Sequence, residues 1–273
     1  MSHLSRSFKA ARDATQAAFH IRLIGTFDPD LVCAPADADA GAWLAAAPAD
    51  FDQFPVRHEG QTIGLLLRSA DAGQPVRAVM QPLSEELIAS ADMPIAELIP
   101  RMKTLPHRLI LRGDHIDGLV TRSDLLKLPV RIVVFGLLTH LETAMGDLVS
   151  THWPDEQWMA KLSPGRRAKL VEKEAILRRR GLNPPRIELT EFADKRDLCK
   201  KLIAADKRRF DREMDGLRDL RDQLAHAATF LDDSDRSTGM SSFVDKCEAA
   251  RFWVQELMTL IEKGAAPAIA PQT

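Results

Sequence analysis

Charged and titratable residues cluster near residue 220. Arg221, Asp222 and His226 lie within six positions, and Arg218 precedes them by about one helical turn. An imidazole with its unperturbed pKa of about 6.5 exchanges protons near neutral pH. A guanidinium presents a fork of donors that fits phosphate oxygens. These residue types therefore indicate proton transfer beside a bound phosphate.

Cleavage of a phosphodiester bond through a neighbouring hydroxyl needs a base, an acid for the leaving oxygen and positive charge on the phosphate. Residues five apart lie about 140° around a helix axis, so Arg221 and His226 of one chain point different ways. This geometry favours either a broken helix or a site that a second copy, related by a two-fold axis, completes without a metal. Asp222, four residues before His226, would orient the imidazole. The alternative is that Arg221, Asp222 and His226 form a surface salt-bridge patch.

The surrounding pattern predicts the helix that positions this cluster. Leu217, Leu220 and Leu224 recur at three- and four-residue spacing, which places one apolar face toward a core and the charged residues off it. Strand signals end near residue 130. Beyond it we expect a bundle of helices at about 130–151, 155–180, 188–205, 206–228 and 241–262.

The Leu-Arg-x-Leu-Arg pattern from Leu217, followed by His226, resembles the signature of HEPN domains (higher eukaryotes and prokaryotes nucleotide-binding). Many members of that family are metal-independent ribonucleases that act as homodimers, and many carry Asn where this chain has Asp222. The resemblance implies that Arg221, His226 and Asp222 are catalytic. Arg218, Arg212 and Glu142 are predicted to contact the substrate, and the alternative for Glu142 is a solvated residue.

The front of the chain repeats one pattern of a helix followed by a hairpin. We expect a helix over about 40–47 with strands at 54–57 and 62–67, and then a helix from residue 94 with strands at 109–111 and 116–121. A shift of 54 residues places Gly64 on Gly118 and Arg68 on Arg122. A helix over 4–20 and a strand over 21–24 are predicted ahead of the repeats.

The stretch from Gly118 to Leu126 resembles the closing signature of a CBS (cystathionine beta-synthase) module, and two such modules form a Bateman pair over about 20–129. The resemblance implies that Thr121 and Asp124, beside Arg122, contact the ribose and phosphates of an adenine nucleotide. The first repeat has Leu67 and Ala70 in place of the Thr and Asp, so at most one good ribose site remains. The alternative is that Thr121 and Asp124 only cap the following helix.

Composition fits two domains of opposite charge. The chain has 273 residues, of which 45% are hydrophobic. Residues 20–129 carry 10 basic and 15 acidic side chains, and residues 161–226 carry 19 and 12. A basic helical segment is either a solvated face or a surface for a polyanion. With no Tyr and 5% aromatic residues, RNA would be held mainly through its phosphates.

No metal or required cofactor is predicted, because the chain lacks a His-Glu-x-x-His pattern and a phosphate-binding Gly-rich loop. Cys33, Cys199 and Cys247 are too widely spaced for a zinc site and fit free thiols. The N-terminus lacks the apolar segment of a secretory signal. The most apolar stretch, 128–141, is interrupted by Pro129, Arg131 and His140, so we expect a cytoplasmic protein without a membrane span.

The sequence therefore predicts an α+β chain: a tandem CBS (α/β) regulatory domain with an N-terminal helix over 1–129, an all-α HEPN-like bundle over 130–264 and a disordered tail over 265–273. The predicted function is a nucleotide-regulated, metal-independent endoribonuclease acting on single-stranded RNA, as a stress, toxin or phage-defence effector. Its expected partners are RNA, an adenine nucleotide, a second copy of the chain and an antitoxin. The alternative is a non-catalytic scaffold that senses adenine nucleotides, binds RNA or dimerises.

Overall fold

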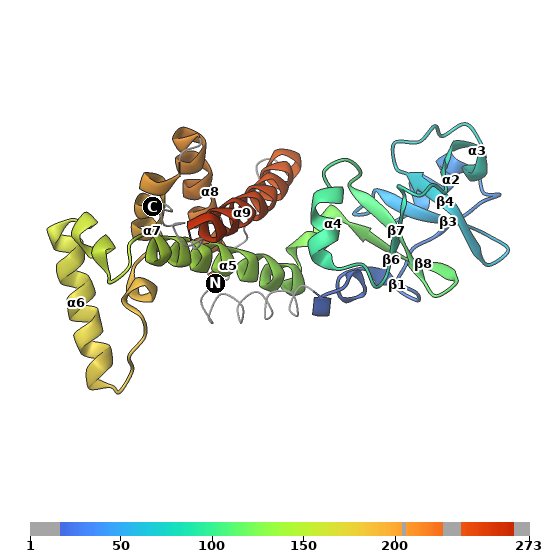
Figure 1. The fold of residues 1–273 in the computed structure, drawn as a ribbon. Coiled ribbons are helices and arrows are strands. Elements are labelled where there is room, and N and C mark those ends of the chain that lie inside the picture. Colours follow the sequence, from blue (N-terminus) through green and yellow to red (C-terminus); the bar gives the residue numbers. More distant parts are fainter. Residues whose placement is uncertain (1–16, 204–205, 226–235, 265–273) are drawn as a thin grey trace, which may run out of the picture. The chain divides into compact units, whose positions relative to one another are not determined.

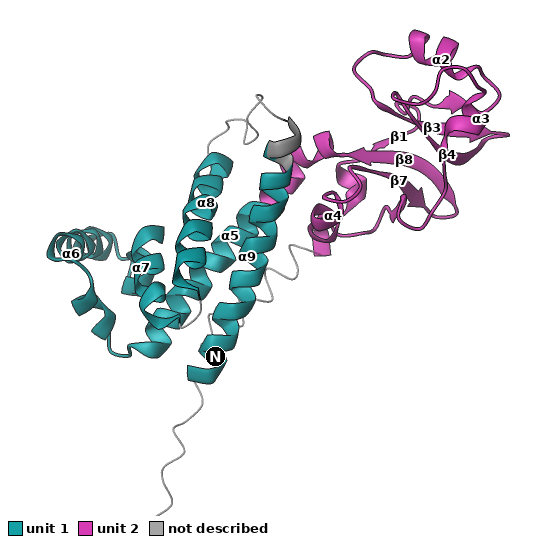
Figure 2. Cartoon of the chain, turned by 90° about the horizontal axis from the view of Figure 1, so that it is seen from above, with its two compact units in different colours: residues 1–15, 134–273 teal, residues 16–133 magenta. Residues whose placement is uncertain are grey.

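The computed structural model describes residues 17–203, 206–225 and 236–264. The described residues divide into an α/β unit that ends at residue 133 and a helical unit that begins at residue 134, and the division lies inside one long helix (Figure 2). The predicted fold class, α+β with an α/β part followed by a helical part, is confirmed by the order of the elements. Most of the predicted helix over 4–20, and the tail over 265–273, lie outside the described residues.

Within the described residues, two four-stranded sheets form the α/β unit, with strand orders β2-β3-β4-β5 and β1-β8-β7-β6 (Figure 1). The strands are β1 (Thr26–Phe27), β2 (Ala34–Pro35), β3 (Gln53–His58), β4 (Gln61–Leu67), β5 (Gln81–Pro82), β6 (Ile88–Ser90), β7 (His107–Arg112) and β8 (His115–Thr121). The α-helices are α2 (Ala40–Ala46), α3 (Val76–Val79) and α4 (Ile95–Arg101), and 3-10 helices span Ile21–Leu23 and Arg122–Leu126.

The predicted repeat is visible in the strand register. In the hairpin β3–β4, Val56 pairs with Gly64, and in β7–β8 Ile110 pairs with Gly118. Each hairpin has a bulge directly after this pair. A shift of 54 residues therefore carries one hairpin onto the other, bulge included.

The edge strand of the second sheet comes from the chain ahead of the first repeat. β1 pairs antiparallel with β8, so that Phe27 lies opposite Gly118. A Cβ at Gly118 would lie 2.6 Å from the Phe27 ring, which is far inside van der Waals contact. The glycine is therefore needed for this close approach of the two strands.

Two clusters of apolar side chains fill the α/β unit. One lies within the first repeat, around Phe54, Val56 and Leu66. The other joins the repeats, because Leu65 of β4 packs with Leu109 and Leu119 of the second hairpin. The hydroxyl of Thr62 also donates to the carbonyl of Ile116 at 2.7 Å.

Two element predictions are wrong in informative ways. The predicted strand over 21–24 is instead a 3-10 helix, Ile21–Leu23, capped by Ile24, and Ile21 and Ile24 are both buried at a spacing of three. The helix predicted over 155–180 begins only at Pro164. Ser163 accepts a hydrogen bond from the backbone of Arg166, and Pro164 fits the first helical position.

The helical unit contains α5 (Leu128–His152), α6 (Pro164–Arg179), α7 (Phe192–Leu202), α8 (Lys207–Ala225) and α9 (Arg236–Gly264), with 3-10 helices at Gln157–Lys161 and Arg186–Leu189. Leu217, Leu220 and Leu224 of α8 are buried, as their spacing predicts. Phe210 of α8 meets Trp253 of α9 edge to face, with ring centroids 4.9 Å apart.

Among the described residues, α5 is the one helix that is long and apolar enough to cross a membrane by length and composition. Of its most apolar 18-residue window, 61% is buried inside the structure. Leu138, Leu141 and Met145 are fully buried on this helix. α5 is therefore a core helix, and its apolar character follows from packing within the protein.

Candidate functional site

A pocket of about 520 Å³ in the helical unit collects four of the six site residues predicted for the bundle. Glu142 reaches it from α5, and Arg218, Arg221 and Asp222 reach it from α8. We call it the site pocket. The three leucines of α8 face the core, so the charged residues between them must lie on the other side of the helix, toward this pocket.

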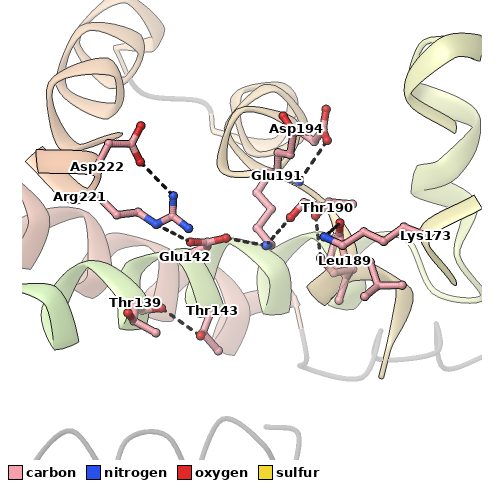
Figure 3. A network of polar contacts seen from close by, with 12 residues as sticks. Thr139, Glu142, Thr143, Lys173, Leu189, Thr190, Glu191, Asp194, Arg221 and Asp222 are labelled. Carbon is pink, nitrogen blue, oxygen red and sulfur yellow. Dashed lines mark hydrogen bonds and ion pairs between the residues drawn. The ribbon is translucent and has the colours of Figure 1, made fainter. Parts of the chain in front are cut away.

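Glu142 is the centre of a polar network that joins three helices (Figure 3). Its Oε2 lies 3.3 Å from Nε of Arg221, and its Oε1 accepts a hydrogen bond of 2.9 Å from Nζ of Lys195 on α7. Lys195 also donates to the carbonyl of Thr190 at 3.1 Å. The guanidinium of Arg221 lies 3.3 Å from Asp222 through Nη1. Glu142 thus fixes the position of Arg221 at the site pocket.

Lys195 was missed by the sequence reasoning. It lies between Asp194 and Arg196 in a run of charged residues, and its position in the sequence does not indicate a special role. In the structure its side chain is 6% exposed, which is rare for lysine and requires a paired carboxylate. The pairing with Glu142 explains why an acidic residue occurs on a core helix.

The site pocket is balanced in charge. Its lining includes four basic and four acidic side chains: Arg166, Lys173, Arg218 and Arg221, and Glu142, Glu188, Glu191 and Asp222. Arg166 contacts Glu191 at 2.7 Å and Asp194 at 3.3 Å, which ties α6 to the start of α7. Such a pocket provides both phosphate-binding cations and carboxylates, but little net attraction for a polyanion.

Two of the predicted residues are not brought to this pocket within the described structure. Arg212 is exposed on α8, nine residues before Arg221, which places it on the opposite side of the helix and about 13.5 Å along its axis. The prediction that Arg212 acts with Arg221 is therefore not supported by their placement. His226 lies outside the described residues.

In the α/β unit, Thr121 and Asp124 form a capping box at the 3-10 helix Arg122–Leu126. Oδ2 of Asp124 accepts hydrogen bonds from the backbone nitrogen of Thr121 at 2.6 Å and from its hydroxyl at 3.1 Å. Oδ1 lies 2.7 Å from Nζ of Lys127. Both oxygens of this buried carboxylate thus have protein partners, and the capping role that the sequence left open is present.

Arg122 has the same structural role as its repeat mate Arg68. Arg122 donates to the carbonyl oxygens of Met102 and Lys103, at the end of α4. Arg68 donates to the carbonyl of Leu44, in the last turn of α2, and to that of Phe51, beyond its end. Cations at a helix C-terminus satisfy its unpaired carbonyl groups. The equivalence under the 54-residue shift therefore reflects helix capping.

His107 is a second residue that the sequence reasoning missed. It begins β7 directly opposite Thr121 of β8, and it is 4% exposed. Neither ring nitrogen has a hydrogen-bond partner among the described residues. Burial, with the nearby charges of Arg108 and Arg122, lowers the pKa of His107 to about 4. The first repeat has Gln53 at this position, so a polar residue in an apolar strand is the signal that could have revealed it.

Within the described part of the chain, no cluster of three His, Cys, Asp or Glu side chains could hold a metal ion. The three cysteines are free thiols. Burial raises the pKa of the Cys199 thiol, and that of Cys247 to about 12. Both thiols therefore stay protonated near neutral pH and are unsuited to nucleophilic chemistry.

Structures of CBS domains are similar to part of the chain. The CBS domain of a bacterial CNNM/CorC family Mg2+ transporter in complex with ATP is 16% identical, with 46% of this chain and 96% of that chain covered and a TM-score of 0.37. CBS domains of a transcriptional regulator from Streptococcus pneumoniae are 16% identical, with 39% and 95% covered and a TM-score of 0.34. A CBS-containing hemolysin-like protein of Oenococcus oeni PSU is 13% identical, with 42% and 93% covered and a TM-score of 0.34.

No family model and no curated protein matches the chain. The similar structures have TM-scores of 0.34 to 0.37 over less than half of the chain, and they assign no activity to it.

Proposed function

We propose that the helical unit is a HEPN-like, metal-independent endoribonuclease acting at the site pocket, and that the α/β unit regulates it by binding an adenine nucleotide. One observation supports the first part above all others. Glu142, Arg218, Arg221 and Asp222, which are up to 80 positions apart in the sequence, line one pocket of about 520 Å³. Each of the four is predicted for this site from the sequence.

Arg221 is the proposed phosphate-binding group. Its side chain is 35% exposed, and its contacts to Glu142 and Asp222 use Nε and Nη1. Among the described residues this leaves Nη2 for a phosphate oxygen. Arg218, one turn earlier on the same face, adds a second fork of donors. Charge fixed in place before the reaction stabilises the crowded phosphate most effectively.

His226 is the proposed proton-transfer group, oriented by Asp222 four residues earlier. A base takes the proton of the 2′-hydroxyl, and the 2′-oxygen forms a bond to the adjacent phosphorus. The bond from phosphorus to the 5′-oxygen breaks, and that oxygen receives a proton from the acid. The products are a 2′,3′-cyclic phosphate and a 5′-hydroxyl. Because residues five apart on a helix point different ways, the second copy in a homodimer would supply the facing groups.

The regulatory part of the proposal places an adenine nucleotide beside Thr121 and Asp124. Asp124 already binds Thr121 and Lys127, so ribose hydroxyls would have to compete with these contacts. His107, opposite Thr121 with two unpartnered ring nitrogens, provides hydrogen-bonding capacity that the described protein groups do not use. Regulation requires that the nucleotide bind one arrangement of the enzyme better than another.

The cleavage assay uses purified protein and single-stranded RNA in EDTA, with and without AMP or ATP. We expect cleavage to a cyclic phosphate by the wild type, and loss of about 100-fold or more in Arg221→Ala and His226→Ala. Arg179→Ala, which removes an exposed arginine from α6, is the matched control. Cleavage that survives both substitutions would remove the proposed site. Calorimetry that detects no nucleotide binding at millimolar concentration would remove the proposed regulator.

A non-catalytic scaffold is the second candidate, and a specific observation favours it. The guanidinium of Arg221 and the carboxylate of Asp124 are both engaged by other protein groups. In that case the network around Glu142 serves only to hold the helices together. Absence of cleavage by the wild type under every condition, with nucleotide binding retained, is the result expected for a scaffold.

A further inference from the structure

A second pocket, of about 650 Å³, adjoins the site pocket. It is lined by residues of the 3-10 helix Gln157–Lys161, the start of α6, α7 and the first residue of α8. Arg166 and Ala193 line both pockets, so the two are neighbours on one surface of the helical unit. We call it the lysine pocket, after Lys161, Lys200, Lys201 and Lys207 in its lining.

The lysine pocket carries excess positive charge, unlike the site pocket. Its basic side chains are the four lysines and Arg166, and its acidic ones are Asp194 and Asp197. Both carboxylates are already engaged, because Asp194 lies 3.3 Å from Arg166 and Asp197 lies 2.8 Å from Arg196. The two acidic groups therefore leave most of the lysine charge uncompensated.

Three of the lysines lack a carboxylate within ion-pair distance in the part of the chain that the structure describes. Lys161 has its ammonium 4.8 Å from the centre of the Trp153 ring, and Lys201 donates to the carbonyl of Lys161 at 3.2 Å. Lys207 is exposed at the start of α8. Lys200, by contrast, is paired with Asp211. Strongly hydrated ammonium groups on flexible stems contact phosphate as point charges, without reading the base.

We propose that the lysine pocket binds the phosphates of the RNA strand that flank the one held at Arg221. This inference rests on the proposed function and deepens it. The charge-balanced site pocket offers specific contacts and little long-range attraction, whereas the lysine pocket offers attraction and adjoins it at Arg166. Binding through this pocket is therefore independent of base sequence and steeply dependent on salt.

The test measures binding of a short fluorescein-labelled single-stranded RNA to the full chain in EDTA, by anisotropy, at KCl concentrations of about 50 to 200 mM. The variant is Lys201→Ala with Lys207→Ala. The control is Lys169→Ala with Arg180→Ala, which removes the same charge from exposed positions on or just after α6. Circular dichroism melting checks that both variants fold. Log K falls linearly with log salt, and the loss of two phosphate contacts makes this negative slope less steep by about 1.4.

We expect the less steep slope and weaker binding only in the lysine variant. We also expect this variant to lose cleavage to a matching extent at RNA concentrations below saturation. Equal slopes in the lysine variant and its control would overturn the pocket assignment, even if Arg221→Ala abolishes cleavage. A reduced slope with no cleavage by any form of the protein would instead overturn the proposed ribonuclease and leave the phosphate-binding pocket standing.

Discussion

Glu142 contacts two cations of different accessibility, and this sets what each can do. Lys195 is nearly inaccessible to solvent, so its ammonium depends on the carboxylate for stability. Arg221 is partly exposed, so its contact with the same carboxylate orients it toward the pocket. One acidic side chain on a core helix thereby stabilises the bundle and positions the proposed phosphate-binding group.

Replacing Glu142 by Leu is expected to destabilise the helical unit by about 3–5 kcal/mol, because Lys195 is left buried with only the Thr190 carbonyl as partner. Glu142→Leu combined with Lys195→Met should cost clearly less than the sum of the single changes. Urea unfolding followed by circular dichroism measures each value. Additive costs would show that the pair is not coupled.

His107 predicts how the stability of the α/β unit depends on pH. Its folded-state pKa of about 4 is below the unfolded value of about 6.5, so the unfolded chain binds the proton first. Above about pH 6.5, His107 adds no pH dependence to the free energy of unfolding. As the pH falls from there toward 4, we expect stability to be lost at up to about 1.4 kcal/mol per pH unit.

His107→Gln, which copies the residue of the first repeat, should flatten this loss between pH 7 and pH 5 in urea unfolding. His115→Gln is the control, since the side chain of His115 on β8 is 79% exposed. An unchanged pH slope in His107→Gln would mean that other groups dominate the acid sensitivity.

The chemically obvious residues of the candidate site were predictable from the sequence, and their supporting groups were not. Arg218, Arg221 and Asp222 lie outside the row of leucines on α8, and the spacing of those leucines predicts that they are buried. Lys195 and His107 gave no comparable pattern, because their importance comes from which strands and helices surround them. Arg212 illustrates the converse, since closeness in sequence does not place it in the pocket.

At the scale of elements, glycines determine how closely the strands of the repeats approach. Gly118→Ala should destabilise the α/β unit by about 1–3 kcal/mol, because the new methyl group would clash with the Phe27 ring. Gly165→Ala, at an exposed position in the first turn of α6, should instead stabilise the helical unit by about 0.5 kcal/mol. Thermal unfolding of the two variants tests the contrast, and similar effects would contradict it.

Most helices and the two central hairpins were predictable because their periodicity is long enough to recognise. The two-residue strands β1, β2 and β5 were not predictable, because two residues are too few to show an alternation of apolar and polar side chains. Their pairing is fixed by distant parts of the chain. The break before α6 was also missed, although Ser163 and Pro164 form an N-terminal signal.

At the scale of the molecule, the α/β unit has its own apolar clusters and both of its sheets lie within residues 16–133. We therefore expect the fragment 17–133 to fold alone and to unfold cooperatively in urea. Near-ultraviolet circular dichroism of the fragment reports on Trp43, its one tryptophan, and the full chain, with four tryptophans, is the comparison. A fragment without a cooperative transition would show that the helical unit is required for its fold.

The pairing of β1 with β8 also has a consequence for the timing of synthesis. Thr26 is made early, but its partner Leu119 follows only about 90 residues later. At about 5–20 residues per second, the first strand waits for roughly 5–20 s before its partner exists. The first repeat can be completed in that interval, and the second can close only by recruiting a strand that was translated before either repeat began.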